Sequence, residues 1–498
     1  MRKLMLVLAV AVIGLLLIAT IAAYWFFSGD GVRRAIEQQA SAWLGQPVKV
    51  GAAHGKIFPR AAITLSDVRV GEPARLALGE VQLSTDLRAL FDRTIDDATV
   101  TISKSRIEMP LPFELPASDD AAATSSQNTS SNSGIRIVSV RAISLDDIRL
   151  VSRGREVRVS ADSSLNGDRL TLRRFDATSG TTALSASGDV NLAPSIEARL
   201  TVKANKLDVD ELLALADAFT PPQTRASPGR SAPAKITARI SAEQANAGGI
   251  EVRQFSTELE VNGDRIALSP LTFQIFGGRY QGSLNAQLGK ALALTIRSRL
   301  QDLDVAQIAA FGGSPDTVSG TLTGAGTFSG TGADVAGVLS GARGMGTATV
   351  MNGTVRRLNL LRTVVLFFGR PSPDAGKGDD RFDRIDATFS LANRIFRADA
   401  FALHSPDADV VGSGTLNSAT QGLDGALDLS LSEELSKQAG TDLIRFTREG
   451  NRVVLPARIS GTISAPRITI DAAAAAKRGL RNETQRRLKG LLDGFKLR

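Results

Sequence analysis

The sequence repeats itself at an offset of 96 residues (261 − 165 = 96). Residues 165–172 read LNGDRLTL, and residues 261–268 read VNGDRIAL. The triplet LDV at 207–209 returns at 303–305 with the same offset, so the two copies stay aligned without a gap between these markers. Self-similarity of this kind is typical of chains built from stacked units, each of which buries its apolar surface against a neighbour.

Each copy predicts a hairpin followed by alternating strands. Asn166-Gly167 and Asn262-Gly263 supply residues that tolerate positive φ, as a two-residue type I′ hairpin turn requires. Apolar residues then occupy every second position, as in Leu292, Leu294 and Ile296 of the second copy and Ile196, Ala198 and Leu200 of the first. This period of two predicts antiparallel strands with one apolar face. Asp208 and Asp304 close the copies, and we expect their carboxylates to cap short helices, one of them over 209–219.

The fold class that this pattern favours is mainly β. A sheet with one apolar face must cover it, but helical segments are few in this sequence. We therefore expect an elongated, twisted antiparallel repeat sheet that forms an open hydrophobic groove, with an N-terminal transmembrane helix and a few short amphipathic helices. A closed sandwich or barrel with an ordinary core is the alternative.

The composition argues against most enzymatic chemistry. Cysteine is absent and there are only two histidines, His54 and His404, which we interpret as surface or turn residues. Disulfides, thiolate zinc sites and cysteine nucleophiles are therefore impossible. Glycines are dense over 312–346, but they lack the strand, spacing and lysine of a phosphate loop, and we interpret them as tight turns. We predict no catalytic residue, no metal site and no cofactor, hence no enzyme.

The first residues predict a membrane anchor. Residues 4–27 contain no charge and are long enough to cross a bilayer core as a helix. We take the anchor to include Leu4, Leu15, Tyr24, Trp25 and Phe26, the last three forming an aromatic belt. Arg2 and Lys3 before the anchor predict a cytoplasmic start with the bulk of the chain outside the cytoplasm. A cleaved signal peptide is the competing interpretation.

The rest of the chain divides by composition. The expected parts are a cytoplasmic tip and anchor (1–29), a helix and first strands (30–115), a flexible loop (116–134), a β repeat (135–219), a proline-rich loop (220–233), a second β repeat (234–312), a C-terminal β region (313–470) and a basic helix (471–498). Within them, a helix is expected over 32–44 and another over 355–368. A second echo relates 63–70 to 143–150 at an offset of 80 residues (143 − 63 = 80).

The C-terminal segment predicts a basic amphipathic helix. From residue 477 onward there are eight basic and two acidic residues, a net charge of 8 − 2 = +6. Such a helix is typical of a membrane-surface segment, although a solvated helix packed on the end of the sheet is the alternative. The residues expected at the membrane surface are Arg481, Arg486, Arg487, Leu488, Leu491 and Phe495.

Several short motifs make the chain resemble the AsmA-like family of Gram-negative envelope proteins. They are WLGQPV at 43–48, ITLSDV at 63–68, LSGARG at 339–344 and NGTV at 352–355. The resemblance covers nearly the whole chain and implies a single-pass inner-membrane protein with its bulk in the periplasm. It also implies a repeating β-groove that acts in outer-membrane biogenesis by conducting phospholipid between inner and outer membranes. The family has no catalytic residues to carry over.

The expected partners are membrane lipids, through their acyl chains, the inner membrane and, at the far end, the outer membrane or a protein in it. Nucleic acid is not expected as a partner. A scaffold or assembly factor for outer-membrane proteins, holding partners at sheet edges or loops, is the alternative. The residues that we expect to line the lipid groove are Leu170, Leu172, Ile196, Leu200, Phe273, Ile275, Leu292, Leu294 and Ile296.

Overall fold

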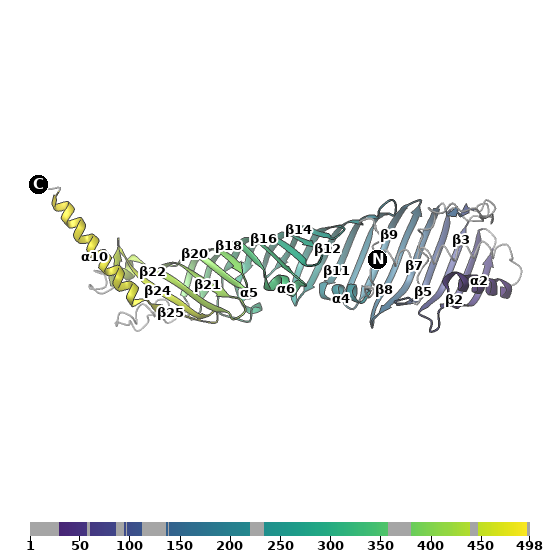
Figure 1. The fold of residues 1–498 in the computed structure, drawn as a ribbon, viewed down its shortest axis with the longest axis horizontal. Helices are drawn as coiled ribbons and strands as arrows, with labels where there is room; N and C mark the ends of the chain where they lie inside the picture. The colour runs from purple at the N-terminus through teal and green to yellow at the C-terminus, as the bar shows by residue number, and fades with distance from the viewer. Residues whose placement is uncertain are drawn as a thin grey trace. The chain divides into compact units, whose positions relative to one another are not determined.

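The computed structural model describes residues 29–56, 60–85, 94–95, 97–111, 136–137, 139–219, 234–356, 380–438 and 447–495. The chain divides into two compact units, Met1–Gly263 and Asp264–Arg498. Strands predominate in both units, and helices are short except at the two ends of the described chain (Figure 1). The predicted mainly β class is therefore confirmed.

Within its described residues, the first unit begins with helix α2 (Gly29–Leu44) and contains one shorter helix, α4 (Val209–Phe219). Its strands pair in the order β1-β2-β3-β5-β7-β8-β9-β10-β11-β12-β13. The strands β4 (Thr94–Ile95) and β6 (Arg136–Ile137) form a separate parallel pair. The strands of the main sheet are β1 (Val48–Lys56), β2 (Ala61–Val70), β3 (Leu76–Thr85), β5 (Ala98–Met109), β7 (Ser139–Ser152), β8 (Arg155–Asn166), β9 (Arg169–Ser179), β10 (Thr182–Asn191), β11 (Glu197–Asp208), β12 (Lys235–Ala247) and β13 (Ile250–Asn262).

The second unit is an antiparallel meander in which each strand pairs with the next, except that β22 pairs with β24, which also pairs with the short β23. Its strands are β14 (Arg265–Ile275), β15 (Gly278–Gln287), β16 (Leu292–Asp304), β17 (Thr321–Gly332), β18 (Arg343–Val355), β19 (Asp380–Ala392), β20 (Ile395–His404), β21 (Ala408–Asn417), β22 (Gly422–Leu431), β23 (Arg448–Glu449), β24 (Arg452–Thr462) and β25 (Ala465–Ile470). The helices among its described residues are α5 (Val305–Phe311), α6 (Val335–Ser340), α8 (Glu433–Gln438) and α10 (Ala472–Phe495).

The expected all-antiparallel sheet is wrong at two places in the first unit. Strand β5 pairs parallel with β7, and β11 pairs parallel with β12, so this sheet is mixed. A parallel pair needs a long crossover connection instead of a tight turn. The connections here contain the segments 116–134 and 220–233, which the composition had marked only as loops.

The repeat of 96 residues is a repeat of structure. Strands β9 and β14 begin at residues 169 and 265, β10 and β15 at 182 and 278, and helices α4 and α5 at 209 and 305, always 96 residues apart (265 − 169 = 96). Each unit holds one copy. The copies differ after the helix, because β11 continues into a parallel partner and β16 into an antiparallel one.

The hairpin turn of the first copy lies one residue later than predicted. Asn166 pairs with Arg169 as the last residue of β8, so the two turn residues are Gly167 and Asp168. Only Gly167 has positive φ, 55°, and a glycine at the first central position is what a type II′ turn requires. Gly263, with φ 60°, holds the equivalent place in the second copy.

The second echo, at an offset of 80 residues, encodes a local backbone irregularity. Asp67 in β2 and Asp147 in β7 are equivalent by sequence and have φ of 52° and 51°. Aspartate enters this left-handed region more readily than most residues. The cross-strand register of β7 shifts around Asp147, between Leu145 and Ile148. The two similar segments, 80 residues apart, thus share the same irregular strand conformation.

Helix α2 covers the start of the first sheet. Its Ile36 and Ala40 are buried in the main core of this unit, as the predicted amphipathic pattern requires. Ser41 Oγ accepts a hydrogen bond from Val48 N at 2.8 Å, and Glu37 Oε1 accepts one from Val50 N at 2.8 Å. Gly45 ends the helix with φ 62°. The helix predicted over 32–44 is therefore confirmed.

Four predictions fall outside the described residues: the membrane anchor over 4–27, with Leu4, Leu15, Tyr24, Trp25 and Phe26; the loop over 116–134; the proline-rich loop over 220–233; and nearly all of the helix over 355–368. Val355, at its start, is the last residue of β18. Within the described ranges, no helix combines the length and the hydropathy needed to span a bilayer.

Candidate functional site

In both units, apolar side chains on one face of the sheet line up from strand to strand. We call this the apolar face, and the opposite side of the same strands the polar face. In the first unit one cross-strand row runs through ten paired strands. Its members, from β2 to β13, are Ile63, Leu83, Val100, Ile143, Ser163, Leu172, Gly188, Leu200, Ala238 and Leu259.

The second unit has the same construction. Its apolar face carries a row that connects β14 to β24 through successive registers. Its members are Leu268, Leu284, Ile296, Phe328, Gly344, Leu391, Phe396, Leu416, Leu423 and Gly461. No charged residue interrupts either row. The registers therefore turn the period of two in the sequence into continuous apolar tracks perpendicular to the strands.

Burial on the apolar face differs along each unit. It is deepest where helices or the sheet itself cover the face, in the core beneath α2 and in a second core that includes Val410, Leu429 and Leu455. From β14 to β17 the corresponding side chains are only half-buried, among them Phe273, Leu284, Leu294, Ile296 and Phe328. Side chains inside a closed two-layer core would be buried instead. This stretch keeps apolar surface available to a ligand.

The residues predicted to line a groove lie on this face, in two separate sets. In the first unit Leu172 pairs with Gly188, and Gly188 pairs with Leu200 on the next strand. Leu170 lies on the same face, and Ile196 is the residue immediately before β11. In the second unit the set comprises Phe273, Ile275, Leu292, Leu294 and Ile296, all on the apolar face of β14 and β16. Leu172 is buried, with 7% of its surface exposed, and the others are half-buried.

Aromatic residues of the same face were missed at the sequence level. Tyr280 stacks on Phe273 with ring centroids 4.4 Å apart and planes 3° from parallel, and its hydroxyl lies 3.0 Å from Ser298 Oγ. Phe389 lies between Phe328, at 6.5 Å, and Phe396, at 5.7 Å. For Phe389, whose neighbours two residues away are Ala387 and Leu391, the period of two was an available signal; Tyr280 and Phe328 have glycines at those positions and gave none.

The interpretation of the glycines over 312–346 as tight turns is confirmed for Gly312, Gly313 and Gly341, which lie in turns, and is wrong for the six that are residues of β17 and β18. Gly324 and Gly326 lie within β17, and Gly344 and Gly346 within β18, all at apolar-face positions. A Cβ atom added at Gly326 would come within 2.8 Å of the Phe328 ring, and one at Gly346 within 2.8 Å of the Phe389 ring. Glycine is needed here because aromatic rings lie directly over the backbone.

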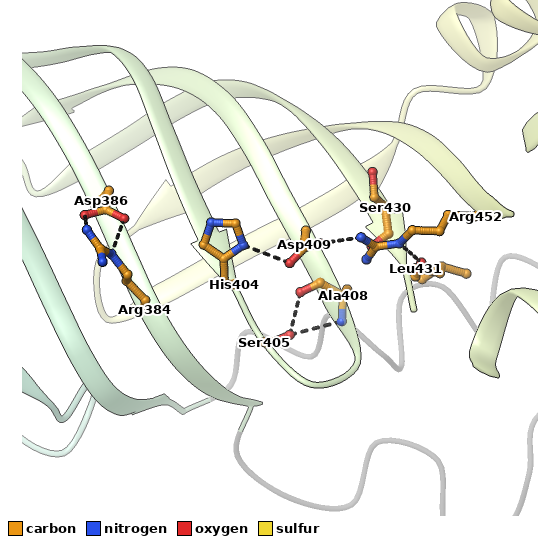
Figure 2. A network of polar contacts seen from close by, with 9 residues as sticks. All are labelled: Arg384, Asp386, His404, Ser405, Ala408, Asp409, Ser430, Leu431 and Arg452. Carbon is orange, nitrogen blue, oxygen red and sulfur yellow. Dashed lines mark hydrogen bonds and ion pairs between the residues drawn. The ribbon is translucent and has the colours of Figure 1, made fainter. Parts of the chain in front are cut away.

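Ion pairs occupy the polar face at the other end of the second unit (Figure 2). Arg384 donates to both carboxylate oxygens of Asp386, and Asp409 accepts from Arg452 and lies 3.0 Å from His404 Nδ1. Arg452 also donates to the Leu431 and Ser430 carbonyl oxygens, at 2.6 and 2.9 Å. The contacts of His404, Asp409 and Arg452 tie β20 to β24 across the strands, whereas the Arg384–Asp386 pair lies within β19.

The electrostatics of this network keep its carboxylates ionised. The hydrogen bond from Arg384, followed by that from Thr349, holds the pKa of Asp386 below its usual value. Burial alone would raise the pKa of Asp409, but hydrogen bonds from Arg452 and His404 outweigh it and lower that pKa. Within the described ranges, no group of three or more His, Asp or Glu side chains is arranged to hold a metal ion.

Helix α10 is attached to the sheet through its polar side. Asp471 caps it by accepting from Ala474 N at 2.9 Å. Arg478 donates to both carboxylate oxygens of Asp428 at 2.9 and 2.8 Å and lies 3.2 Å from Glu449. Leu480, two residues on, is 72% exposed. The apolar side chain of Leu480 therefore does not pack on the sheet.

The predicted C-terminal helix is thus confirmed as a helix, and its membrane role stays a prediction. Arg481 is exposed, whereas the side chains of Arg486, Arg487, Leu488, Leu491 and Phe495 lie outside the described part of the structure. Comparison of the chain with protein-family models, with curated proteins and with solved structures gave no match.

Proposed function

We propose that this chain is a non-enzymatic lipid-binding protein that carries phospholipid acyl chains along the apolar faces of its sheets. The observation that supports this most directly is the half-buried apolar face from β14 to β17, where Phe273, Leu284 and Ile296 keep solvent-accessible surface. Large apolar patches that stay uncovered are typical of interaction or ligand-binding surfaces.

The magnitudes favour an acyl chain as the ligand. Each methylene group that leaves water contributes about 0.8 kcal/mol, so ten of them would contribute roughly 8 kcal/mol before ordering costs. Neighbouring strands lie about 4.8 Å apart, so successive members of one row offer a chain similar contacts at short intervals. A ligand that meets an equivalent apolar position at every strand can shift along the row with little change in energy.

The proposal extends to location. The uncharged segment over 4–27 would anchor the chain in the inner membrane, and, as the resemblance to the AsmA-like family implies, the bulk would lie in the periplasm and act in outer-membrane biogenesis. Helix α10, held by Arg478 with Leu480 exposed, would meet a membrane surface through its basic residues. In this view phospholipid passes between inner and outer membranes along the apolar face.

A photo-reactive amino acid in β16 tests the proposal with a control one residue away. Ile296 lies on the apolar face, and Thr295 points to the opposite face of the same strand. Illumination in cells should attach phospholipid to a chain labelled at position 296 and far less to one labelled at position 295. Equal labelling at both positions, or attachment of protein instead of lipid at position 296, would favour the scaffold alternative.

A further inference from the structure

The polar face of the second unit contains a hollow that the lipid proposal does not use. It has a volume of about 650 Å³ and is lined by residues of β14 to β19. Its floor consists of two adjacent cross-strand rows. One row is Gln281, Arg299, Ala325, Thr347 and Thr388, and the other is Ser283, Arg297, Thr327 and Met345. Arg297 and Arg299 are thus the two positively charged residues that line this hollow.

Neither arginine has a partner within the described residues. Arg297 is flanked across the strands by Ser283 and Thr327, and Arg299 by Gln281 and Ala325, all of them neutral. The first unit shows the contrasting arrangement. There Arg199 stands directly opposite Asp189, and Arg239 opposite Glu258.

Within the described residues, the acidic side chain of the polar face that comes nearest along the strands, Asp386, lies two residues from Thr388 in β19 and is already paired with Arg384. The strands β15, β17 and β18 contain no acidic residue, and in β16 the only ones are Asp302 and Asp304, at its end. Asp304 is occupied as the cap of α5, where it accepts from Ala306 N at 2.9 Å. The potential over the hollow is therefore positive and open to an anion.

The rest of the lining indicates which anion. Arg297 and Arg299 are two residues apart on one strand, so their Cα atoms are separated by about 6.8 Å, a spacing at which two guanidinium groups can converge on one phosphate. Hydroxyl groups of Ser283, Thr327 and Thr347 border the same space. Hydroxyls both donate and accept, so they suit a ligand that carries hydroxyl groups beside its charge.

We propose that this hollow binds an anionic phosphate ester that bears hydroxyl groups, with Arg297 and Arg299 as the phosphate ligands. A glycerol phosphate has this chemistry, either as a free molecule or as the headgroup of an anionic phospholipid. The site lies on the face opposite the apolar rows, so phosphate binding at the hollow can be tested separately from acyl-chain binding.

The test uses the full chain in a neutral detergent. Glycerol 3-phosphate is titrated by calorimetry, and phosphatidylglycerol and phosphatidylcholine are compared in mixed micelles by native mass spectrometry. The double variant Arg297→Ala with Arg299→Ala should weaken binding at least about tenfold, since several charge-assisted hydrogen bonds are lost. The pair Arg297→Lys with Arg299→Lys should lose part of the affinity, because it keeps the charge without the bidentate geometry.

The control is Arg279→Ala with Arg343→Ala, which removes the same charge from the same face outside the hollow. Binding of glycerol 3-phosphate that is lost only in the Arg297 and Arg299 variant identifies a site for the free ester. A preference for phosphatidylglycerol over phosphatidylcholine that is lost only in that variant, without binding of the soluble ester, identifies a headgroup site. Absence of both, or equal loss in the control pair, would overturn the proposal.

Discussion

Single residues decide how closely side chains can pack on the apolar face. Phe328 and Phe389 lie over glycines whose hydrogen atoms occupy the place of a side chain. The glycines therefore have a packing role, which no property of an isolated glycine in the sequence reveals.

Replacing Gly346 by alanine should destabilise the fold. The added Cβ would lie 2.7 Å from the Ala325 carbonyl oxygen and 2.8 Å from the Phe389 ring, so backbone or ring must shift. We expect a loss of about 1 to 3 kcal/mol in the free energy of unfolding, measured by urea denaturation. Gly289→Ala is the matched control, because its Cβ would meet nothing nearer than 3.7 Å. Equal effects of the two substitutions would disprove the packing role.

Asp409 should make stability depend on acid pH. Its folded-state pKa is lowered, although burial opposes this, because Arg452 and His404 hydrogen-bond to the ionised carboxylate. A lowered pKa contributes stability above the pKa of 3.8 of an aspartate in the unfolded chain, and that stability disappears as pH falls through the folded-state value. The urea midpoint should therefore fall more between about pH 5 and about pH 3 in the wild type than in Asp409→Asn. Asp424→Asn, whose side chain forms no hydrogen bond or ion pair within the described residues, should behave like the wild type. Identical profiles for all three proteins would refute this.

At the scale of elements, the period of two was sufficient to predict where strands lie but not how they pair. Strands β9 to β11 and β14 to β16 carry alternating apolar residues and tight turns, so they were recognisable from the sequence. The parallel pairs β5 with β7 and β11 with β12 were not, because pairing direction depends on long connections that leave no local signature.

The candidate site was predictable to a similar extent. Leu294 and Ile296 alternate with polar neighbours, and that alternation places them correctly on one face. Phe328 was missed, because strand β17 alternates between threonine or serine and glycine, and glycine gives no apolar signal. Which members of a row stay half-buried depends on the covering elements, and this cannot be read from periodicity.

The attachment of helix α10 should depend on one arginine. Arg478→Ala removes the paired contacts with Asp428 and Glu449, so the first turns of α10 should separate from the sheet. Hydrogen exchange at the amides of residues 475–480 should then accelerate, while exchange in β22 and β24 stays slow. Arg481→Ala, at an exposed position of the same helix, should leave exchange unchanged. Protection that survives in Arg478→Ala would mean that other contacts hold the helix.

At the scale of the whole molecule, both units are built in the same way. Their strands have an apolar and a polar face, and the pairing register aligns the apolar residues of successive strands in rows. Each unit contains a copy of the same 96-residue pattern, and in each the row passes from strand to strand without a charge. A design of this kind can lengthen a lipid-binding surface by adding strands, without a new site for each addition.

Mass spectrometry of lipids that co-purify with residues 31–498, expressed in the periplasm and washed free of detergent, tests this account most directly. We expect several phospholipids per chain in the wild type and in the control Thr295→Asp, whose substitution lies on the opposite face of β16. Leu294→Asp with Ile296→Asp should lose most of them, because two carboxylates would then interrupt neighbouring apolar rows. A folded wild-type protein without lipid, or equal lipid in all three proteins, would contradict the central claim.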